Sequence, residues 1–171
     1  DAIKNGIGLI PEDRKNFGLI LKHTIKDNST LIQIKKMLSG VLLNSKKENK
    51  HIEESIKDLS IKVSDYNLKV SSLSGGNQQK IVISKWKDMD LKILIFDEPT
   101  KGIDVNAKED IFKVIEDYAA KGVGIIFISS DLGEVERIAD RVLVLKRGNF
   151  INELRGNDIN IEKINYLALN G

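Results

Sequence analysis

Two short apolar runs that end in polar side chains constrain the fold of this chain most. The first run, Ile93 to Phe96, is followed directly by Asp97 and Glu98, and the second occupies residues 123–129. Strands that are apolar on both faces are typical of parallel sheets covered by helices. Since the interval between the runs is long enough for one helix, the sequence predicts a strand–helix–strand unit of an α/β fold.

The rest of the chain fits the same fold class. Apolar residues at helical or strand spacing, with Gly and Pro as breaks, define the other elements. Asn106, with Glu109 three residues later, forms a capping pattern that predicts the start of a helix ending near Gly122. The remaining expected elements are a strand at 6–10, helices at 26–37, 44–60, 77–87, 132–139 and 161–169, and a hairpin of 141–146 with 150–154 around Gly148-Asn149.

Charge and composition exclude several classes of protein. The 171 residues suffice for one domain with a real core, and 27 basic residues nearly balance 25 acidic ones. Such a mixture lacks the basic field that binds nucleic acid, so we expect no nucleic-acid partner. No apolar run approaches the roughly 18 residues of a membrane-spanning helix, and the absence of cysteine excludes a disulfide framework.

The carboxylates Asp97 and Glu98 follow a parallel-type strand, and ligands of open α/β sheets bind at the carboxyl ends of such strands. Mg²⁺ prefers hard oxygen ligands and keeps several waters, so one carboxylate here is suited to support it. The other is suited to polarise an attacking water as a general base, a role that contributes roughly 10²–10⁴-fold. Taken alone, the pair is equally consistent with a strand that simply ends at the surface.

A second polar segment, Ser74-Gly75-Gly76, precedes an expected helix. Glycines let the backbone approach an anion closely, and a helix N-terminus offers free N–H groups and the positive end of a dipole. On its own, however, the segment is more simply an N-cap and a turn, and Gln78 suits a plain exposed helix.

Other isolated features also have simple structural explanations. Residues 102–104 alone suggest a turn, and residues 129–131 alone suggest a helix cap. Neither His23 nor His51 has ligand-like spacing, so we expect both at the surface, and we expect Trp86 in the core.

Together, in this order and spacing, these segments resemble the motifs of the ATP-binding cassette (ABC) ATPases. Residues 73–78 match the family's signature motif, 93–98 its Walker B strand and 102–104 its D-loop. The resemblance spans nearly the whole chain and is narrowest to the second cassette of bacterial ribose/xylose-type sugar importers. The segments that carry this narrower resemblance are Gly8 to Lys15, Asn77 to Lys80 and Phe96 to Val105.

The resemblance implies an α/β fold: an incomplete ABC ATPase cassette with a partial RecA-like parallel sheet and a helical signature subdomain. It implies that residues 1–171 form a partial nucleotide-binding domain, with the helical and signature subdomain at about 15–76 and the remaining core at about 77–171. Nowhere does the sequence contain the G-x-x-x-x-G-K-[ST] loop, Walker A, that holds phosphates. We therefore expect an excised, C-terminal part of the second cassette, inactive by itself.

In the family two cassettes pack head to tail, and ATP held by the phosphate loop of one is closed over by the signature motif of the other. The resemblance therefore implies that Ser74, Gly75 and Gly76 bind the γ-phosphate of ATP held by a partner cassette, with Gln78 nearby.

For this cassette's own site, the resemblance implies that Asp97 supports Mg²⁺, that Glu98 is the general base and that Asp104 communicates across the dimer interface. Two positions depart from the general pattern. Glu12 stands where the family usually offers a Gln to metal and water, and Ser130 stands where a His usually contacts the γ-phosphate. Both departures indicate that this site is the weaker of the pair.

The resemblance implies an ATPase subunit that uses ATP and Mg²⁺ to drive import of a simple sugar at the cytoplasmic face of the cell membrane. Its implied partners are a first cassette in the same or a second chain, transmembrane permease subunits and, indirectly, a periplasmic or extracellular sugar-binding protein. Two alternatives stay open: a degenerate cassette that hydrolyses nothing, and the ATPase of a nucleoside importer. A family member acting on DNA or ribosomes would need a long coiled coil or basic arm, which the sequence lacks.

Overall fold

The computed structural model describes residues 1–170, which divide into two compact units, residues 1–126 and 127–170. The first unit combines a parallel pair of strands with several helices, and the second contains an antiparallel hairpin with a helix before and after it in the chain. The predicted α/β class is confirmed. Within residues 1–170, no helix has the length and apolar character needed to cross a membrane.

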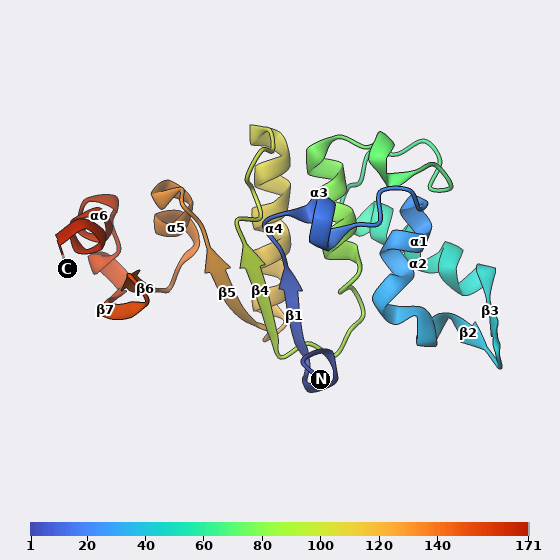
Figure 1. Ribbon diagram of the computed structural model, residues 1–171, viewed down its shortest axis with the longest axis horizontal. Helices are drawn as coiled ribbons and strands as arrows, with labels where there is room; N and C mark the ends of the chain where they lie inside the picture. The colour runs from blue at the N-terminus through green and yellow to red at the C-terminus, as the bar shows by residue number, and fades with distance from the viewer. Residues whose placement is uncertain (171) are drawn as a thin grey trace. The chain divides into compact units, whose positions relative to one another are not determined.

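The sheet orders its strands β1–β4–β5 (Figure 1). These strands are β1 (Ile7–Ile10), β4 (Ile93–Asp97) and β5 (Gly124–Ile128). β1 runs parallel to β4, with Ile10 opposite Phe96. Because parallel strands end at the same edge of a sheet, the loops that carry Glu12 and Glu98 leave the sheet together, where α/β proteins bind ligands.

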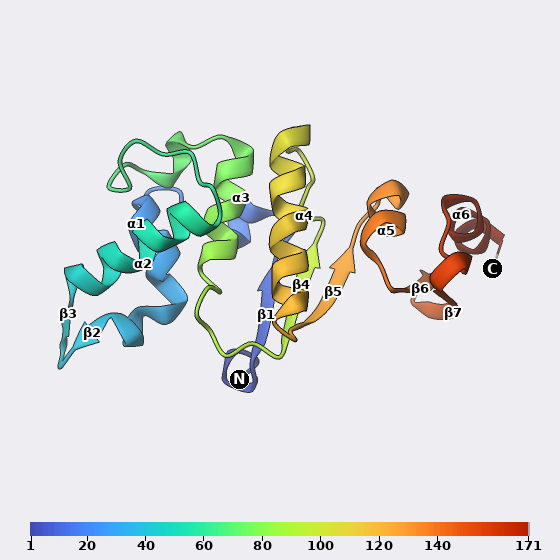
Figure 2. The same cartoon turned by 180° about the vertical axis from the view of Figure 1, so that it is seen from behind.

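The two faces of the sheet differ in burial. Leu94 and Phe96 are fully buried, and a Cβ on Gly8 would lie 2.9 Å from the ring of Trp86, which confirms Trp86 as a core residue. α4 (Val105–Ala120) lies against the sheet in both ribbon views (Figures 1 and 2). The residues that alternate with the buried ones are partly exposed. The parallel pairing predicted for β4 is confirmed, although only one of its faces is fully buried within residues 1–170.

A group of helices follows β1 in the chain (Figure 2). The helix predicted at 26–37 is divided, since α1 ends at Thr30 and a 3₁₀ segment continues to Met37. The Thr30 hydroxyl donates to the carbonyl of Lys26 at 3.1 Å, a local bond that competes with regular helix geometry. The helix predicted at 44–60 is confirmed as α2. The elements are α1 (Ile25–Thr30), β2 (Leu38–Ser39), β3 (Leu42–Leu43), α2 (Ser45–Asp58), α3 (Gly75–Ser84) and short non-α helices at Ile3–Asn5, Arg14–Gly18, Leu31–Met37 and Val70–Ser72.

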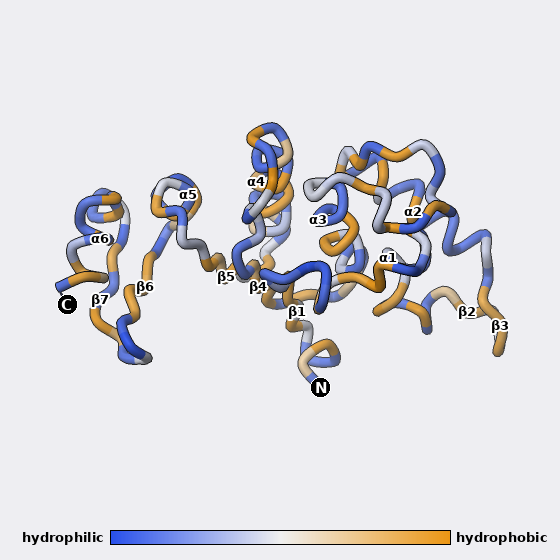
Figure 3. Tube along the Cα trace, turned by 45° about the horizontal axis from the view of Figure 1, so that its top comes forward, coloured by the Kyte–Doolittle hydropathy of each residue, from blue (hydrophilic) through white to orange (hydrophobic). Residues whose placement is uncertain are grey.

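β2 and β3 form a small antiparallel hairpin that turns at Gly40, whose φ is +64°. The tube in Figure 3 is orange, and therefore hydrophobic, along β3, where both residues are leucines. Positive φ values favour glycine, which explains why Gly40 breaks the helical pattern here.

α4 begins two residues earlier than the sequence pattern predicted. The Asp104 side chain accepts a hydrogen bond from the Ala107 backbone N–H at 3.0 Å, so Asp104 is the N-cap. Asn106 lies inside the first turn, and the prediction that it caps this helix is wrong. The extended backbone of Asp104, with φ −70° and ψ 159°, provides the geometry that a cap requires.

The second unit is built around the hairpin of β6 and β7. Its core consists of Val142, Val144, Leu154 and Ile164. The predicted hairpin is confirmed, but its turn residues are Arg147 and Gly148, both with positive φ, while Asn149 already pairs with Lys146. The elements are α5 (Leu132–Ile138), β6 (Arg141–Lys146), β7 (Asn149–Arg155), a 3₁₀ turn at Gly156–Asp158 and α6 (Ile161–Asn170).

Candidate functional site

The signature turn, residues Ser74 to Gly76, starts α3 at the surface of the first unit. Ser74 is exposed, and its hydroxyl accepts hydrogen bonds from the backbone and side chain of Asn77 at 3.5 and 3.0 Å. Gly76 is buried, and a Cβ on it would lie 2.5 Å from the Cβ of Ala107 in α4. The turn is thus an N-cap, as the simple interpretation held, and it begins a helix, where first-turn N–H groups lack intrahelical partners in general.

Gln78 points back into the loop that precedes the signature turn. Its side chain is buried, and its amide donates to the carbonyls of Leu73 at 3.1 Å and Val70 at 3.4 Å. Within residues 1–170 its Oε1 atom has no hydrogen-bond partner. These contacts make Gln78 a support for the turn, and the expected nucleotide contact of Gln78 stays a prediction.

Arg14 connects the loop after β1 to two other segments of the site. Its Nη1 donates to the carbonyl of Lys101 at 3.2 Å, and its Nη2 lies 2.7 Å from the position that a Cβ on Gly75 would occupy. Burial lowers the pKa of Arg14 below its usual value, yet an arginine stays cationic at neutral pH. A permanent positive charge therefore lies beside the signature turn. Sequence reasoning missed this role, although a lone arginine directly after Glu12 and Asp13 was a visible signal.

Glu12 is exposed and forms an ion pair with Lys101 across 2.5 Å. The hydrogen bond and charge of Glu12 raise the pKa of Lys101 above 10.5. Exposed ion pairs contribute little to the free energy of unfolding, so the main effect of this pair is to reduce the net charge around Glu12. The negative charge of Glu12 is therefore partly offset by the neighbouring cation Lys101.

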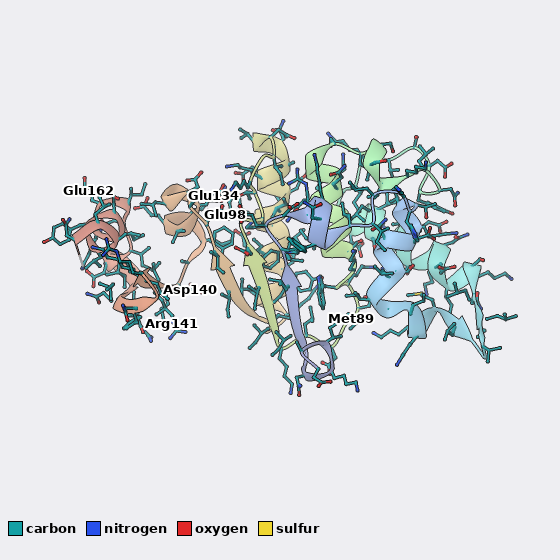
Figure 4. The ribbon with its side chains drawn as sticks, in the orientation of Figure 1. Met89, Glu98, Glu134, Asp140, Arg141 and Glu162 are labelled. Carbon is teal, nitrogen blue, oxygen red and sulfur yellow. The ribbon has the colours of Figure 1, made fainter. Side chains whose placement is uncertain are left out.

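Asp97 and Glu98 lie at the carboxyl end of β4, as predicted, and both are partly buried. Figure 4 labels Glu98 at this end of the strand. Glu98 has a φ of +45°, a left-handed conformation that costs free energy in a residue other than glycine. Such strain is concentrated at functional sites. No cluster of three or more His, Cys, Asp or Glu residues within positions 1–170 is arranged to hold a metal. Asp97 therefore fits Mg²⁺ only as a single carboxylate, with water and phosphate oxygens completing the shell.

Asp104 lies beside the signature turn within the same chain. One of its carboxylate oxygens caps α4, and the other lies 3.8 Å from the position of a Cβ on Gly76. The structure thus brings the loops after β1 and β4 together with the signature turn in the first unit.

Ser130 belongs to the second unit, in the exposed loop that follows β5. Its neighbour Ser129 donates to Oε2 of Glu134 at 3.1 Å and accepts from the Asp131 backbone N–H at 3.1 Å. Asp131 in turn caps α5 by accepting from Gly133. The expected cap is confirmed, and the expected nucleotide contact of Ser130 stays a prediction.

The fold and the order of these motifs define a class of protein. The family described as "ABC transporter" matches residues 1–101, more than half of the chain, and the chain belongs to this family. A parallel sheet, a signature turn at the start of a helix and paired carboxylates after a strand agree with that assignment.

Curated relatives match the chain over its entire length. "Xylose import ATP-binding protein XylG" of Geobacillus kaustophilus is 45% identical over 171 residues, which are 100% of this chain and 34% of the relative. "Ribose import ATP-binding protein RbsA" of Shouchella clausii is 42% identical over 171 residues, with the same two coverages. The chain therefore spans about a third of the length of these relatives.

Solved structures agree with the fold. A "Dimeric Structure of MJ0796, a Bacterial ABC Transporter Cassette" is 25% identical, with a TM-score of 0.72 over 87% of this chain and 62% of that chain. MJ1267, "an ATP-binding cassette of an ABC transporter", has a TM-score of 0.74 over 99% of this chain and 67% of that chain; at 22% identity it supports the fold alone.

Proposed function

We propose that this chain is the signature-bearing part of an ABC ATPase that powers import of a monosaccharide at the cytoplasmic face of the membrane. The names of its relatives, which print ribose and xylose import, support this substrate class. In this proposal the chain works with a partner cassette and membrane permease subunits, and a segment outside this sequence supplies the phosphate-binding loop. A solved dimeric cassette of similar fold supports the paired arrangement.

One observation carries the proposal: the signature turn is exposed at Ser74 and fixed from behind at Gly76. An anion-binding turn has to reach a phosphate held elsewhere, which requires exposure, and it has to keep its donors aligned, which requires rigid support. The Ser74 hydroxyl and the N–H groups at the start of α3 would donate to the terminal phosphate of ATP held by the partner. The charge of Arg14 would add to that attraction.

The carboxylates after β4 have a separate proposed role in the site of this cassette. Glu98 would accept a proton from the attacking water, and Asp97 would orient a water of the metal shell. Mg²⁺, when bound, supplies charge neutralisation for the phosphates. The subdomain division at about residue 76 remains part of this proposal.

Two substitutions in a protein that carries both cassettes test the proposal. Glu98→Gln keeps the size of the side chain and removes the base, and Ser74→Arg blocks the exposed turn. We expect Ser74→Arg to lower ATP hydrolysis and sugar uptake at least tenfold, since it blocks the turn that closes over the partner's ATP. We expect Glu98→Gln to lower hydrolysis at this cassette's own, weaker site by the roughly 10²–10⁴-fold that a general base contributes. Ser71→Arg, an exposed change three residues upstream, is the control.

The same pair of variants separates the main alternative. If Ser74→Arg abolishes hydrolysis while Glu98→Gln changes nothing, the cassette is a degenerate module that supplies only its signature. The ion pair of Glu12 with Lys101 favours this alternative. Glu12 stands where the family usually has a neutral Gln that contacts metal and water, and here its carboxylate is already paired with a lysine. Normal hydrolysis in both variants would contradict the proposal. A nucleoside importer is distinguished by the compound whose uptake is lost.

The chain by itself should bind Mg-ATP weakly, because it lacks a Walker A loop. We expect a Kd of about 1 mM or weaker, equivalent to roughly 4 kcal/mol of binding free energy. Isothermal titration calorimetry measures this value, and micromolar affinity would contradict the expectation.

A further inference from the structure

Three consecutive apolar side chains are exposed at the end of the β2–β3 hairpin. Val41, Leu42 and Leu43 are 92%, 72% and 50% exposed. Each strand has two residues, and a Cβ on Gly40 would meet no atom within 4 Å, so the hairpin ends in open space. β3 is hydrophobic in Figure 3. Exposed apolar patches of this kind mark surfaces that contact a partner or a membrane.

Along the chain, the charged residues on either side of the hairpin have one sign. From Asn28 to Lys47 the chain contains four lysines and no acidic residue, although its total net charge is only +2. The next acidic residue, Glu48, is buried. Lys47 is held at the base of the hairpin, where its ammonium donates to the carbonyl of Leu38 at 2.6 Å. The exposed lysines that flank the hairpin on both sides are Lys35, Lys36, Lys46 and Lys47.

We propose that the β2–β3 hairpin docks this protein directly on an anionic lipid surface, with Val41 and Leu42 at the boundary between headgroups and acyl chains. An apolar tip surrounded by lysines has the chemistry of an interfacial membrane anchor. Lysines alone would suit any polyanion, and apolar residues alone would suit any hydrophobic partner. The combination favours a membrane, whose headgroups are negatively charged at the surface and whose acyl chains below them are apolar. This contact needs neither nucleotide nor a second cassette.

Vesicle cosedimentation of the full 171-residue chain tests the proposal. We expect binding to vesicles of phosphatidylcholine with about one third phosphatidylglycerol, weakening with salt, and no binding to phosphatidylcholine alone. A variant with Val41→Asp and Leu42→Asp should bind at least tenfold more weakly. Since a lysine at an anionic surface contributes about a fivefold gain in binding, Lys35→Gln with Lys46→Gln should cost about 25-fold.

Matched controls change the same residue types elsewhere. Leu169→Asp replaces an apolar residue that is 66% exposed, and Lys4→Gln with Lys113→Gln removes two exposed lysines. Both should bind like the original chain, and circular dichroism shows whether all variants keep the fold. A Leu42→Trp variant reports depth, because bromine-labelled acyl chains should quench its fluorescence.

The proposal is overturned if the chain ignores anionic vesicles, if it binds both vesicle types equally, or if the Val41/Leu42 variant binds unchanged. It is also overturned if labelled acyl chains fail to quench Leu42→Trp, which would indicate purely electrostatic adsorption. Binding to polyglutamate with the same lysine dependence, without vesicle binding, would replace lipid by an acidic protein surface. None of these results bears on the ATPase proposal, whose tests measure hydrolysis and uptake.

Discussion

The signature turn and the turn at residues 101–104 both lead into a helix through a side-chain cap, Ser74 for α3 and Asp104 for α4. Both also contain glycine, but for different physical reasons. Space requires glycine at Gly76, where a Cβ would lie 2.5 Å from the Cβ of Ala107. Conformation requires it at Gly102, where φ is +69° and no atom lies within 4 Å of a Cβ. The two turns therefore differ in how tightly they are packed.

This difference shows how the site divides rigid and adaptable parts. The first helical turn of α3 packs directly on α4, so its N–H groups keep a fixed direction. The turn at 101–104 is largely exposed and can adjust to a neighbouring surface. In the proposed function, the rigid turn addresses a phosphate and the open turn faces the partner cassette.

The largest effect is expected for Gly76→Ala, which should break the packing of α3 on α4. Adding a methyl group to a close-packed contact typically costs about 1–3 kcal/mol of unfolding free energy. Gly75→Ala should cost less than about 1 kcal/mol, because the atom nearest to the new methyl is the end of the flexible Arg14 side chain at 2.7 Å and the next is the Gly102 carbonyl oxygen at 3.3 Å. Urea unfolding measures both. Equal losses would mean that Arg14 is held rigidly, and the comparison between crowded and yielding neighbours would fail.

A second test concerns the ion pair that joins α3 to α4. Lys80 of α3 is buried, and its ammonium lies 2.7 Å from Oδ2 of Asp110 in α4. Asp110→Asn should lower the unfolding free energy by about 1–2 kcal/mol, because it leaves a buried charge with a weaker partner while the carbonyl of Ser60 still accepts from it. Asp117→Asn, an exposed change on the same helix, should be nearly neutral. A neutral Asp110→Asn would show that packing alone aligns the helices.

A smaller effect is expected at Gly102. Alanine there meets no atom within 4 Å but has to adopt a left-handed conformation, which costs about 1 kcal/mol. Gly102→Asn should recover part of the loss, since asparagine tolerates that conformation. Thermal and urea unfolding distinguish the two variants. If alanine and asparagine were equally destabilising, a steric cause would apply here as it does at Gly76.

The smallest effect is expected from pH, through a residue outside both turns. Burial lowers the pKa of His51 below 6.5, although Asp88 at 3.7 Å opposes the shift. The unfolded chain then binds more protons than the folded chain below pH 6.5, so stability is complete above pH 6.5 and declines as pH falls through the lowered pKa. His51→Gln should flatten this decline in unfolding curves measured at several pH values. His23→Gln, at an exposed position, should leave it unchanged.

Local patterns predicted most elements, and they failed where a competing local contact or distant packing intervened. The amphipathic helix at 44–60 and the hairpin near Gly148 follow from periodicity and turn chemistry, and both are confirmed. The helix at 26–37 failed because a side-chain bond of Thr30 interrupts it. The cap was assigned to Asn106 because the sequence offers two capping residues within three positions, and backbone geometry selects Asp104.

The histidines show the same limit. Both were expected at the surface, and that prediction is wrong for His51, which is only 5% exposed. A polar neighbourhood in sequence suggested solvent, whereas α2 packs against α1 and directs this side chain inward. Within residues 1–170 its Nε2 atom is buried without a hydrogen-bond partner, which no sequence pattern indicates.

The sequence by itself determined the α/β class and the ABC family, because strand and helix periodicity and the order of short motifs are properties of neighbouring residues. It also identified Ser74, Gly76, Asp97 and Glu98 as candidate site residues. Only the tertiary structure decided that Arg14 lies beside the signature turn and donates to the carbonyl of a residue 87 positions away. That contact exists because two parallel strands end at the same edge of the sheet, which brings together loops that are distant in sequence. The residues of either loop alone do not indicate it.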